Sequence, residues 1–273
     1  MIATQRSIAF FALASSVGAA GIANAQLPAP NAGGISTGHI HLTVPDVSEH
    51  RALWLDLGGV AKTSGRLELI EFPGIYVLLT EGEPAAASAA TSANHFGFSV
   101  RDYATYRAKL VAAGASFFYE SEDNGQILAD LPGGVRIEIL TDAEQAEPIA
   151  FHHMHLATTD VEGLSQWYVE TFAAEAGERR GLPSALVPGG RVDFLPAQAD
   201  ADGNGPRGSR GAAIDHIGFE VADIDAFAAR MQQQGIEFDF GPATIDAIGL
   251  TIAFLTDPAG TYIEITEGLA DIE

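Results

Sequence analysis

The segment His216-Ile-Gly-Phe-Glu-Val-Ala-Asp223 decides the fold, because the same pattern occurs three more times in the chain. The other copies are His39-Ile-His-Leu-Thr-Val-Pro-Asp46, His95-Phe-Gly-Phe-Ser-Val-Arg-Asp102 and His153-Met-His-Leu-Ala-Thr-Thr-Asp160. Each copy begins with His, alternates like a half-buried β-strand and reaches Asp seven residues later. Four copies of one pattern in a single chain indicate repeated structural modules.

A helix is expected after each of these Asp residues. An Asp side chain accepts hydrogen bonds from the free N–H groups of a first helical turn and so caps it. The spacing of apolar residues predicts helices over residues 47–57, 103–113, 161–173 and 224–234. Gly58, Gly114 and Gly235 follow three of these ranges, as is typical of helix C-termini.

Each module then continues with short β-rich runs. Pro132-Gly-Gly-Val-Arg-Ile-Glu138 matches Pro258-Ala-Gly-Thr-Tyr-Ile-Glu264, with Pro, Gly and Glu at the same places. The first module has Leu78 where the fourth has Glu264, and the third module has Asp193 there. The sequence therefore predicts an α+β fold of four βαβββ modules. We expect them to pair in chain order, as residues 38–145 and 151–268.

Composition excludes several classes of function. The chain has 273 residues, 47% of them hydrophobic, which is enough for two domains with packed cores. Its net charge of −22 would repel nucleic acid and anionic membrane surfaces. Because there is no cysteine, disulfides, Cys-ligated zinc, iron–sulfur clusters and thiol nucleophiles are excluded. Any bound metal would be held by His and carboxylate side chains.

The repeated His and Glu residues suit such a metal. Two His that begin first strands and one Glu on a last strand form a set in each half of the chain: His39, His95 and Glu138 in the first half, and His153, His216 and Glu264 in the second. Two neutral imidazoles and a carboxylate can hold Fe, Mn, Zn, Ni or Co and leave positions open. The alternative is a set of ordinary His residues satisfied by hydrogen bonds. Four of the eight His share the equivalent place in the repeat, which favours the metal.

His155 and Tyr262 are candidate catalytic residues. Residues two apart on a strand share a face, so His155 lies beside His153, and Tyr262 beside Glu264. His41 takes the place of His155 in the first module. These side chains would orient a substrate or move a proton, unless they are interior polar groups that satisfy one another.

The two remaining His residues are not expected to bind metal. His152 directly precedes His153, so it should point to the opposite face of the strand. His50 falls in the first predicted helix, where we expect it on the surface.

These motifs resemble the vicinal-oxygen-chelate superfamily, which includes glyoxalase I, extradiol dioxygenases, methylmalonyl-CoA epimerase and the fosfomycin and bleomycin resistance proteins. The resemblance covers residues 38–268 and is most specific at residues 215–221 and 257–264. It implies two tandem glyoxalase-like domains, each a cupped mixed sheet of two modules, with the metal held by first-strand His and last-strand carboxylate residues. It also implies a small substrate that binds the metal through two adjacent oxygens, where a developing oxyanion is stabilised.

Departures from the subfamily patterns narrow the activity. Extradiol dioxygenases carry Tyr where this chain has Phe254, and a His that is missing between Ile245 and Ala253, which disfavours ring cleavage. Glyoxalase I-like enzymes use a fourth protein ligand, which would be Asp193 in the second half, unless Asp193 is an ordinary polar residue. We therefore expect a lyase, isomerase or dioxygenase type of enzyme, with the second half favoured as the active site. A non-catalytic protein that binds or sequesters a small molecule is the alternative, and a structural domain with vestigial His a third.

The N-terminus predicts export. Residues 1–25 read as a signal peptide, with Arg6, an apolar run and the small-x-small site Ala23-Asn24-Ala25, and the breaks by Ser and Gly disfavour a buried helix. Residues 26–37 are predicted to be a linker. No later apolar run approaches the ~20 residues that span a membrane. We expect a periplasmic or secreted protein for which an oligomer is possible but not required.

Overall fold

The computed structural model describes residues 27–200 and 203–272. The predicted signal peptide, residues 1–25, lies outside the described residues. Within them, each of the four modules has the order βαβββ. Among these residues no helix is long and apolar enough to cross a membrane.

The elements follow the repeat closely. The first module comprises β1 (Ile35–Val44), α1 (Val47–Leu57), β2 (Val60–Ser64), β3 (Leu67–Phe72) and β4 (Ile75–Glu81). The second comprises β5 (Ala93–Val100), α2 (Tyr103–Ala112), β6 (Ser116–Ser121), β7 (Gln126–Asp130) and β8 (Arg136–Thr141). The third comprises β9 (Ile149–Thr158), α3 (Val161–Phe172), β10 (Glu175–Arg179), β11 (Leu182–Val187) and β12 (Gly190–Pro196). The fourth comprises β13 (Ile214–Val221), α4 (Ile224–Gln234), β14 (Phe240–Ile245), β15 (Leu250–Thr256) and β16 (Tyr262–Glu267).

The helices begin and end where the sequence predicts, within one residue. Each begins after the Asp of its repeat, whose side chain accepts a hydrogen bond from the backbone N–H three residues on, in Glu49, Thr105, Gly163 and Ala226. Gly58 and Gly235 end α1 and α4 in the left-handed region, which favours glycine. The third helix ends at Ala173, which adopts the same region (φ 48°) without being glycine.

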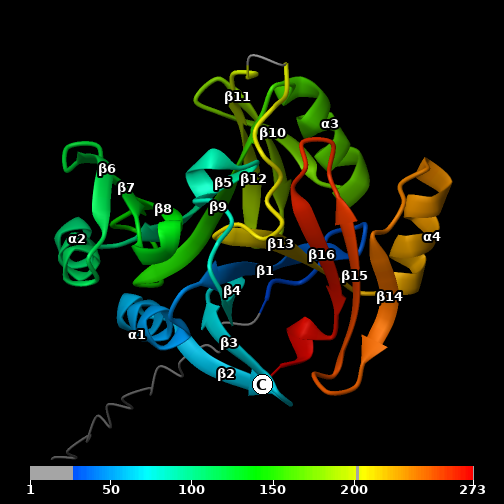
Figure 1. The fold of residues 1–273 in the computed structure, drawn as a ribbon, viewed down its shortest axis with the longest axis horizontal. Helices are drawn as coiled ribbons and strands as arrows, with labels where there is room; N and C mark the ends of the chain where they lie inside the picture. The colour runs from blue at the N-terminus through cyan, green and yellow to red at the C-terminus, as the bar shows by residue number, and fades with distance from the viewer. Residues whose placement is uncertain (1–26, 201–202, 273) are drawn as a thin grey trace, which may run out of the picture.

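The strands form two eight-stranded mixed sheets, and here the predicted pairing of modules is wrong. One sheet has the order β14-β15-β16-β13-β1-β4-β3-β2, and the other the order β10-β11-β12-β9-β5-β8-β7-β6. Figure 1 shows β1 beside β13, although these strands come from opposite ends of the chain. The first module therefore shares a sheet with the fourth, and the second with the third. We call the cupped sheets the outer cup and the inner cup, respectively.

The predicted pairing is wrong because the first strands of all four modules share one sequence pattern. Each of these strands could form an antiparallel pair with any other, so the pattern alone does not show which two strands pair. Proximity along the chain then favours neighbouring modules. In the structure, residues 82–92 instead carry the chain from one sheet to the other, and each pair of central strands, β1 with β13 and β5 with β9, is antiparallel.

One hydrophobic core joins the two sheets. On β1 the side chain of Ile40 points into this core, whereas His39 and His41 point into the cup, as period-2 alternation requires. All four modules contribute aromatic rings to the core, including Trp54, Phe98, Phe172 and Phe219. The Phe172 and Phe219 rings, from α3 and β13, stack with centroids 4.1 Å apart, which ties the inner-cup module to the outer cup.

The predicted linker is packed against the domain. The strand β1 begins at Ile35, inside the range 26–37 that was expected to be a linker. Before it, the Asn31 side chain donates hydrogen bonds to the carbonyls of Phe172 and Ala173 at the end of α3. Leu27 is buried in a second, smaller hydrophobic cluster of the outer cup.

Candidate metal centres

Two groups of His and Glu side chains lie inside the cups. The outer group, in the outer cup, consists of His39, His41, His216 and Glu264, and the inner group, in the inner cup, consists of His95, Glu138, His153 and His155. In each group one ligand atom from every residue lies within 4.8 Å of the others. Six of the eight His of the chain are thus gathered into two equivalent sets.

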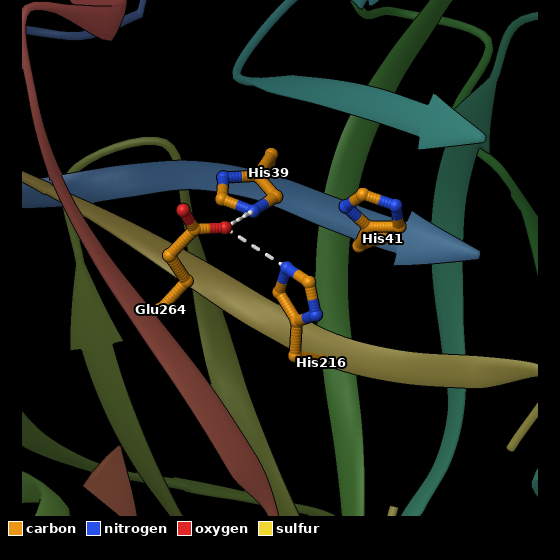
Figure 2. A group of neighbouring side chains, drawn as sticks. All are labelled: His39, His41, His216 and Glu264. Carbon is orange, nitrogen blue, oxygen red and sulfur yellow. Dashed lines mark hydrogen bonds and ion pairs between the residues drawn. The ribbon is translucent and has the colours of Figure 1, made fainter. Parts of the chain in front are cut away.

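The outer group is built on three neighbouring strands. Figure 2 shows His39 and His41 on β1, His216 on β13 and Glu264 on β16, with the His39 and His216 rings turned toward Glu264 and His41 beside them. The Glu264 Oε2 atom lies 2.9 Å from His39 Nε2 and 2.9 Å from His216 Nε2. His41 completes the group beside His216, with ring centroids 4.5 Å apart.

The inner group repeats this arrangement. The Glu138 Oε2 atom of β8 lies 2.9 Å from His153 Nε2 and 3.4 Å from His95 Nε2. His155 occupies the place of His41, and its Nδ1 lies 2.6 Å from His95 Nε2.

The structure corrects the predicted sets. His39 was expected with His95 and Glu138, but it lies with His216 and Glu264. His153 likewise lies with His95 and Glu138. Because β1 pairs with β13 and β5 with β9, each group takes its His residues from both halves of the chain. The six His and Glu positions were identified from the repeat, and their grouping was wrong.

Glycine makes room for one His in each group. Gly218 pairs with His39 across the sheet, and a Cβ on Gly218 would lie 2.1 Å from His39 Nδ1. Gly97 pairs with His153, and a Cβ there would lie 2.3 Å from the His153 ring. In each cup the Gly of the His-x-Gly strand therefore leaves space for the first His of the paired His-x-His strand.

Burial and neighbouring charges set the protonation of both groups. Burial lowers the pKa of His39 and of His153, so both imidazoles are neutral. Burial alone would raise the pKa of Glu264, but the nearby His39 imidazole and the hydrogen bond from His216 outweigh it and hold the pKa well below its usual range. The pKa of Glu138 is lowered in the same way by the nearby His153 and His95 imidazoles. Both carboxylates are therefore anionic.

The unsatisfied nitrogens fit a divalent metal. The Nε2 atoms of His39 and His153 are buried and, although close to a carboxylate oxygen, have no hydrogen-bond partner with suitable geometry. A buried polar atom without a partner is costly, and a metal ion would satisfy it. Neutral imidazoles with one carboxylate are the ligands that Fe, Mn, Zn, Ni and Co accept.

Asp215, Asn94 and His152 contact the Nδ1 atoms of His residues in the two groups, and sequence reasoning missed these contacts. Asp215 Oδ1 lies 2.6 Å from His216 Nδ1, and Asn94 Oδ1 lies 2.8 Å from His95 Nδ1. The hydrogen bonds of Asp215 and Glu264 raise the pKa of His216 against the opposing effect of burial.

His152, expected to face away, has its Nδ1 2.7 Å from His153 Nδ1 and its Nε2 3.0 Å from Arg191. Each of the three missed residues directly precedes a His of one of the two groups in the sequence, which is the signal that could have found them.

Asp193, the expected fourth ligand, lies outside both groups. Its Oδ1 accepts a hydrogen bond from Ser184, and its Oδ2 lies 3.2 Å from Arg179 Nη1 and 3.3 Å from Arg191 Nε. The same oxygen lies 3.4 Å from His155 Nε2. The Asp193 carboxylate thus connects His155 to two arginines.

The ring of Tyr262 contacts the outer group. The ring packs edge-on against His216, with centroids 5.9 Å apart, and stacks on Phe254 at 4.8 Å.

His50, expected on the surface, is buried in the structure. Its Nε2 lies 2.9 Å from the Pro132 carbonyl of the second module.

The second half of the chain is similar in sequence to a known protein family. Residues 150–265 match the model of the Glyoxalase/Bleomycin resistance protein/Dioxygenase superfamily. The match covers most of the third and fourth modules, which are therefore similar in sequence to this superfamily. No curated protein sequence matches the chain significantly.

Solved structures extend the likeness to the whole glyoxalase-like fold. Glyoxalase I from Zea mays is 14% identical, with a TM-score of 0.64 over 87% of this chain and 94% of the maize chain. A candidate dioxygenase from Bacillus subtilis subsp. subtilis strain 168 is 13% identical, with a TM-score of 0.63 over 89% of this chain and 86% of its own. At 13–14% identity these similarities show a shared fold only, and the shared fold extends over nearly all of this chain.

Proposed function

We propose that this protein is a metal-dependent enzyme that acts on a small molecule through two adjacent oxygens. One observation carries the proposal: two equivalent groups of three His and one Glu point into the two cups, each with a buried imidazole Nε2 that lacks a hydrogen bond. The superfamily match and the likeness to a lyase and to a candidate dioxygenase support a lyase, isomerase or dioxygenase type of reaction.

The residues of each group have distinct tasks in this proposal. In the outer group, His39, His216 and Glu264 converge on one point and would hold the cation; in the inner group, His153, His95 and Glu138 would do so. A bound divalent cation supplies a Lewis acid for the substrate oxygens.

His41 and His155 are only partly buried and lie at the rim of their groups. We assign them to the substrate side, where a neutral imidazole can take up a proton from a carbon or oxygen next to the bound oxygens. Thr80 Oγ1, 2.7 Å from His41 Nε2, and Asp193, beside His155 Nε2, fix the orientation of the two rings.

Metal analysis of isosteric variants tests the proposal. The purified protein should contain, or take up, about two equivalents of metal. Glu264→Gln and Glu138→Gln should each lose one equivalent, because an amide keeps the shape of the carboxylate but removes its charge, and the double variant should lose both. A folded protein that takes up no Fe, Mn, Zn, Ni or Co would refute the enzyme proposal and favour a metal-free binding protein.

We also propose that the mature protein is periplasmic or secreted, from the composition of residues 1–25. Fractionation of expressing bacteria, followed by N-terminal sequencing, tests this. The expected product begins at Gln26 and lies outside the cytoplasm, and an intact N-terminus in the cytoplasmic fraction would contradict it.

A further inference from the structure

The two cups offer different walls to a ligand, although their backbones are equivalent. On β4 of the outer cup, Leu78 pairs with His41. At the equivalent place on β12 of the inner cup, Asp193 pairs with His155. One wall of the outer cup is therefore apolar, whereas that of the inner cup is charged.

The opposite walls differ as well. Phe254 of β15 pairs with Glu264 in the outer cup, and Leu128 of β7 pairs with Glu138 in the inner cup. Two residues before its Glu, the outer cup carries Tyr262. The inner cup carries an arginine at that place, Arg136, which is bound to Asp130. At these two positions, next to the Glu of each group, the outer cup is aromatic and the inner cup is not.

These aromatic residues form a row that leads from the outer group to the surface. The Tyr262 and Phe254 rings stack at 4.8 Å with an interplanar angle of 14°, and Arg210 covers Tyr262 at 4.6 Å. Phe254 packs edge-on against His216 at 5.3 Å. Beyond it, Phe240 of β14 lies 6.3 Å from Phe254 and is 47% exposed. Ligand-binding sites are typically lined by apolar and aromatic side chains with a few polar groups, which is the composition of this row and the group at its end.

The other end of the outer cup is filled by the protein itself. The 3₁₀ helix Leu269–Asp271 follows β16, and Leu269 and Ile272 pack with Tyr76 and Leu78 in one apolar cluster. Figure 1 shows this segment between β16 and β3. A ligand that reaches the outer group therefore approaches from the side of the aromatic row.

We propose that the outer cup is the substrate-binding cup and that it selects a small molecule whose two adjacent oxygens carry an aromatic group. The oxygens reach the outer group, and the ring packs against Phe254 and Phe240. The inner cup, whose wall residues are paired with one another, does not favour such a ligand. This inference rests on the proposed function, because the outer group must hold a metal for the oxygens to bind.

Two hydroxamates provide the test. Benzohydroxamate and acetohydroxamate both chelate a metal through two adjacent oxygens and differ only in a phenyl or a methyl group. Calorimetric titration uses the full chain loaded with Co²⁺, in a Glu138→Gln background that leaves only the outer group to bind metal. We expect benzohydroxamate to bind about tenfold more tightly than acetohydroxamate.

Variants of the row localise the preference. Phe254→Leu copies the inner cup, and Phe240→Ala removes an exposed ring; each should reduce the preference for benzohydroxamate to about threefold or less. Tyr119 occupies the place of Phe240 in the inner cup, across from Leu128, and is 42% exposed. Tyr119→Ala is therefore the matched control and should leave the preference unchanged.

The outcomes separate the two proposals. If the outer group takes up Co²⁺ but both hydroxamates bind with equal affinity, or the preference survives in both Phe variants, the aromatic substrate class is wrong and the metal site stands. If the outer group takes up no Co²⁺, the proposed function itself fails.

Discussion

At the scale of single residues, the outer and inner groups differ in the side chain behind one His. Asp215 holds His216 in the outer group, and Asn94 holds His95 in the inner group. A carboxylate behind a ligating imidazole raises its basicity, and losing such a partner typically costs about 10–100-fold in metal affinity. We expect Asp215→Asn to weaken metal binding by the outer group by about tenfold. The reciprocal Asn94→Asp should strengthen binding by the inner group.

Competition titration with a chelator measures both affinities, in proteins whose other group is removed by the Glu→Gln change. If neither Asp215→Asn nor Asn94→Asp changes the metal affinity of its group, Asp215 and Asn94 serve only the fold.

The two cup glycines give a second prediction at this scale. Because a Cβ at residue 218 would overlap the His39 ring, Gly218→Ala must displace either the imidazole or β13. Overpacking of this kind costs roughly 1–3 kcal/mol in the free energy of unfolding. The variant should lose the metal of the outer group and keep that of the inner group, as judged by elemental analysis and urea unfolding.

Gly205→Ala is the control for Gly218→Ala, because its nearest neighbour would be an ordinary 3.7 Å contact with Thr159. Full metal content in Gly218→Ala would contradict the close packing.

At the scale of elements, the sequence predicted the helices and strands well and their partners badly. The capping Asp and the apolar spacing are local signals, and all four helices begin where these signals stand. The pairing of β1 with β13 depends on contacts between residues some 180 positions apart, to which a strand pattern shared by four modules gives no clue. For the same reason the residues that gather in the two groups were predicted from the repeat, whereas their grouping was not.

A buried carboxyl makes the end of the outer cup sensitive to pH. Glu220 of β13 accepts hydrogen bonds from the backbone N–H groups of Gly268 and Ala270 and from Thr266 Oγ1. Burial outweighs these bonds and raises the pKa of Glu220 to about 7. A carboxyl whose pKa is higher in the folded than in the unfolded chain stabilises the fold at low pH. That contribution is present below about pH 4.5 and is lost as the pH rises toward 7.

Glu220→Gln should therefore flatten the pH dependence of stability between about pH 5 and 7.5. Across this window the free energy of unfolding should change by on the order of 2 kcal/mol less in the variant than in the wild-type protein. Urea unfolding at a series of pH values measures it. Glu267→Gln is the control, because Glu267 accepts a hydrogen bond from the N–H of Ile224 at the start of α4 and should keep the wild-type slope. Identical slopes in all three proteins would show that Glu220 does not titrate in this window.

At the scale of the whole molecule, the exchange of modules makes each candidate metal group depend on both halves of the chain. The outer group needs β1 from the first half and β13 and β16 from the second, and the inner group needs β5 and β8 with β9. A chain whose modules paired in sequence order would place His39 with His95, and His153 with His216. The two arrangements share every ligand residue and differ only in which ligands act together, so paired substitutions distinguish them.

If the first module pairs with the fourth, His39→Ala/His216→Ala removes two ligands from one group and should cost one equivalent of metal. His39→Ala/His95→Ala then removes one ligand from each group and should weaken or abolish both sites. Pairing in chain order predicts the reverse, with His39→Ala/His95→Ala losing one equivalent and His39→Ala/His216→Ala losing both. Elemental analysis of the two double variants, with circular dichroism to establish that both are folded, decides between them. Because the four His occupy one repeated position and are all buried, each double variant removes the same chemistry and is the control for the other.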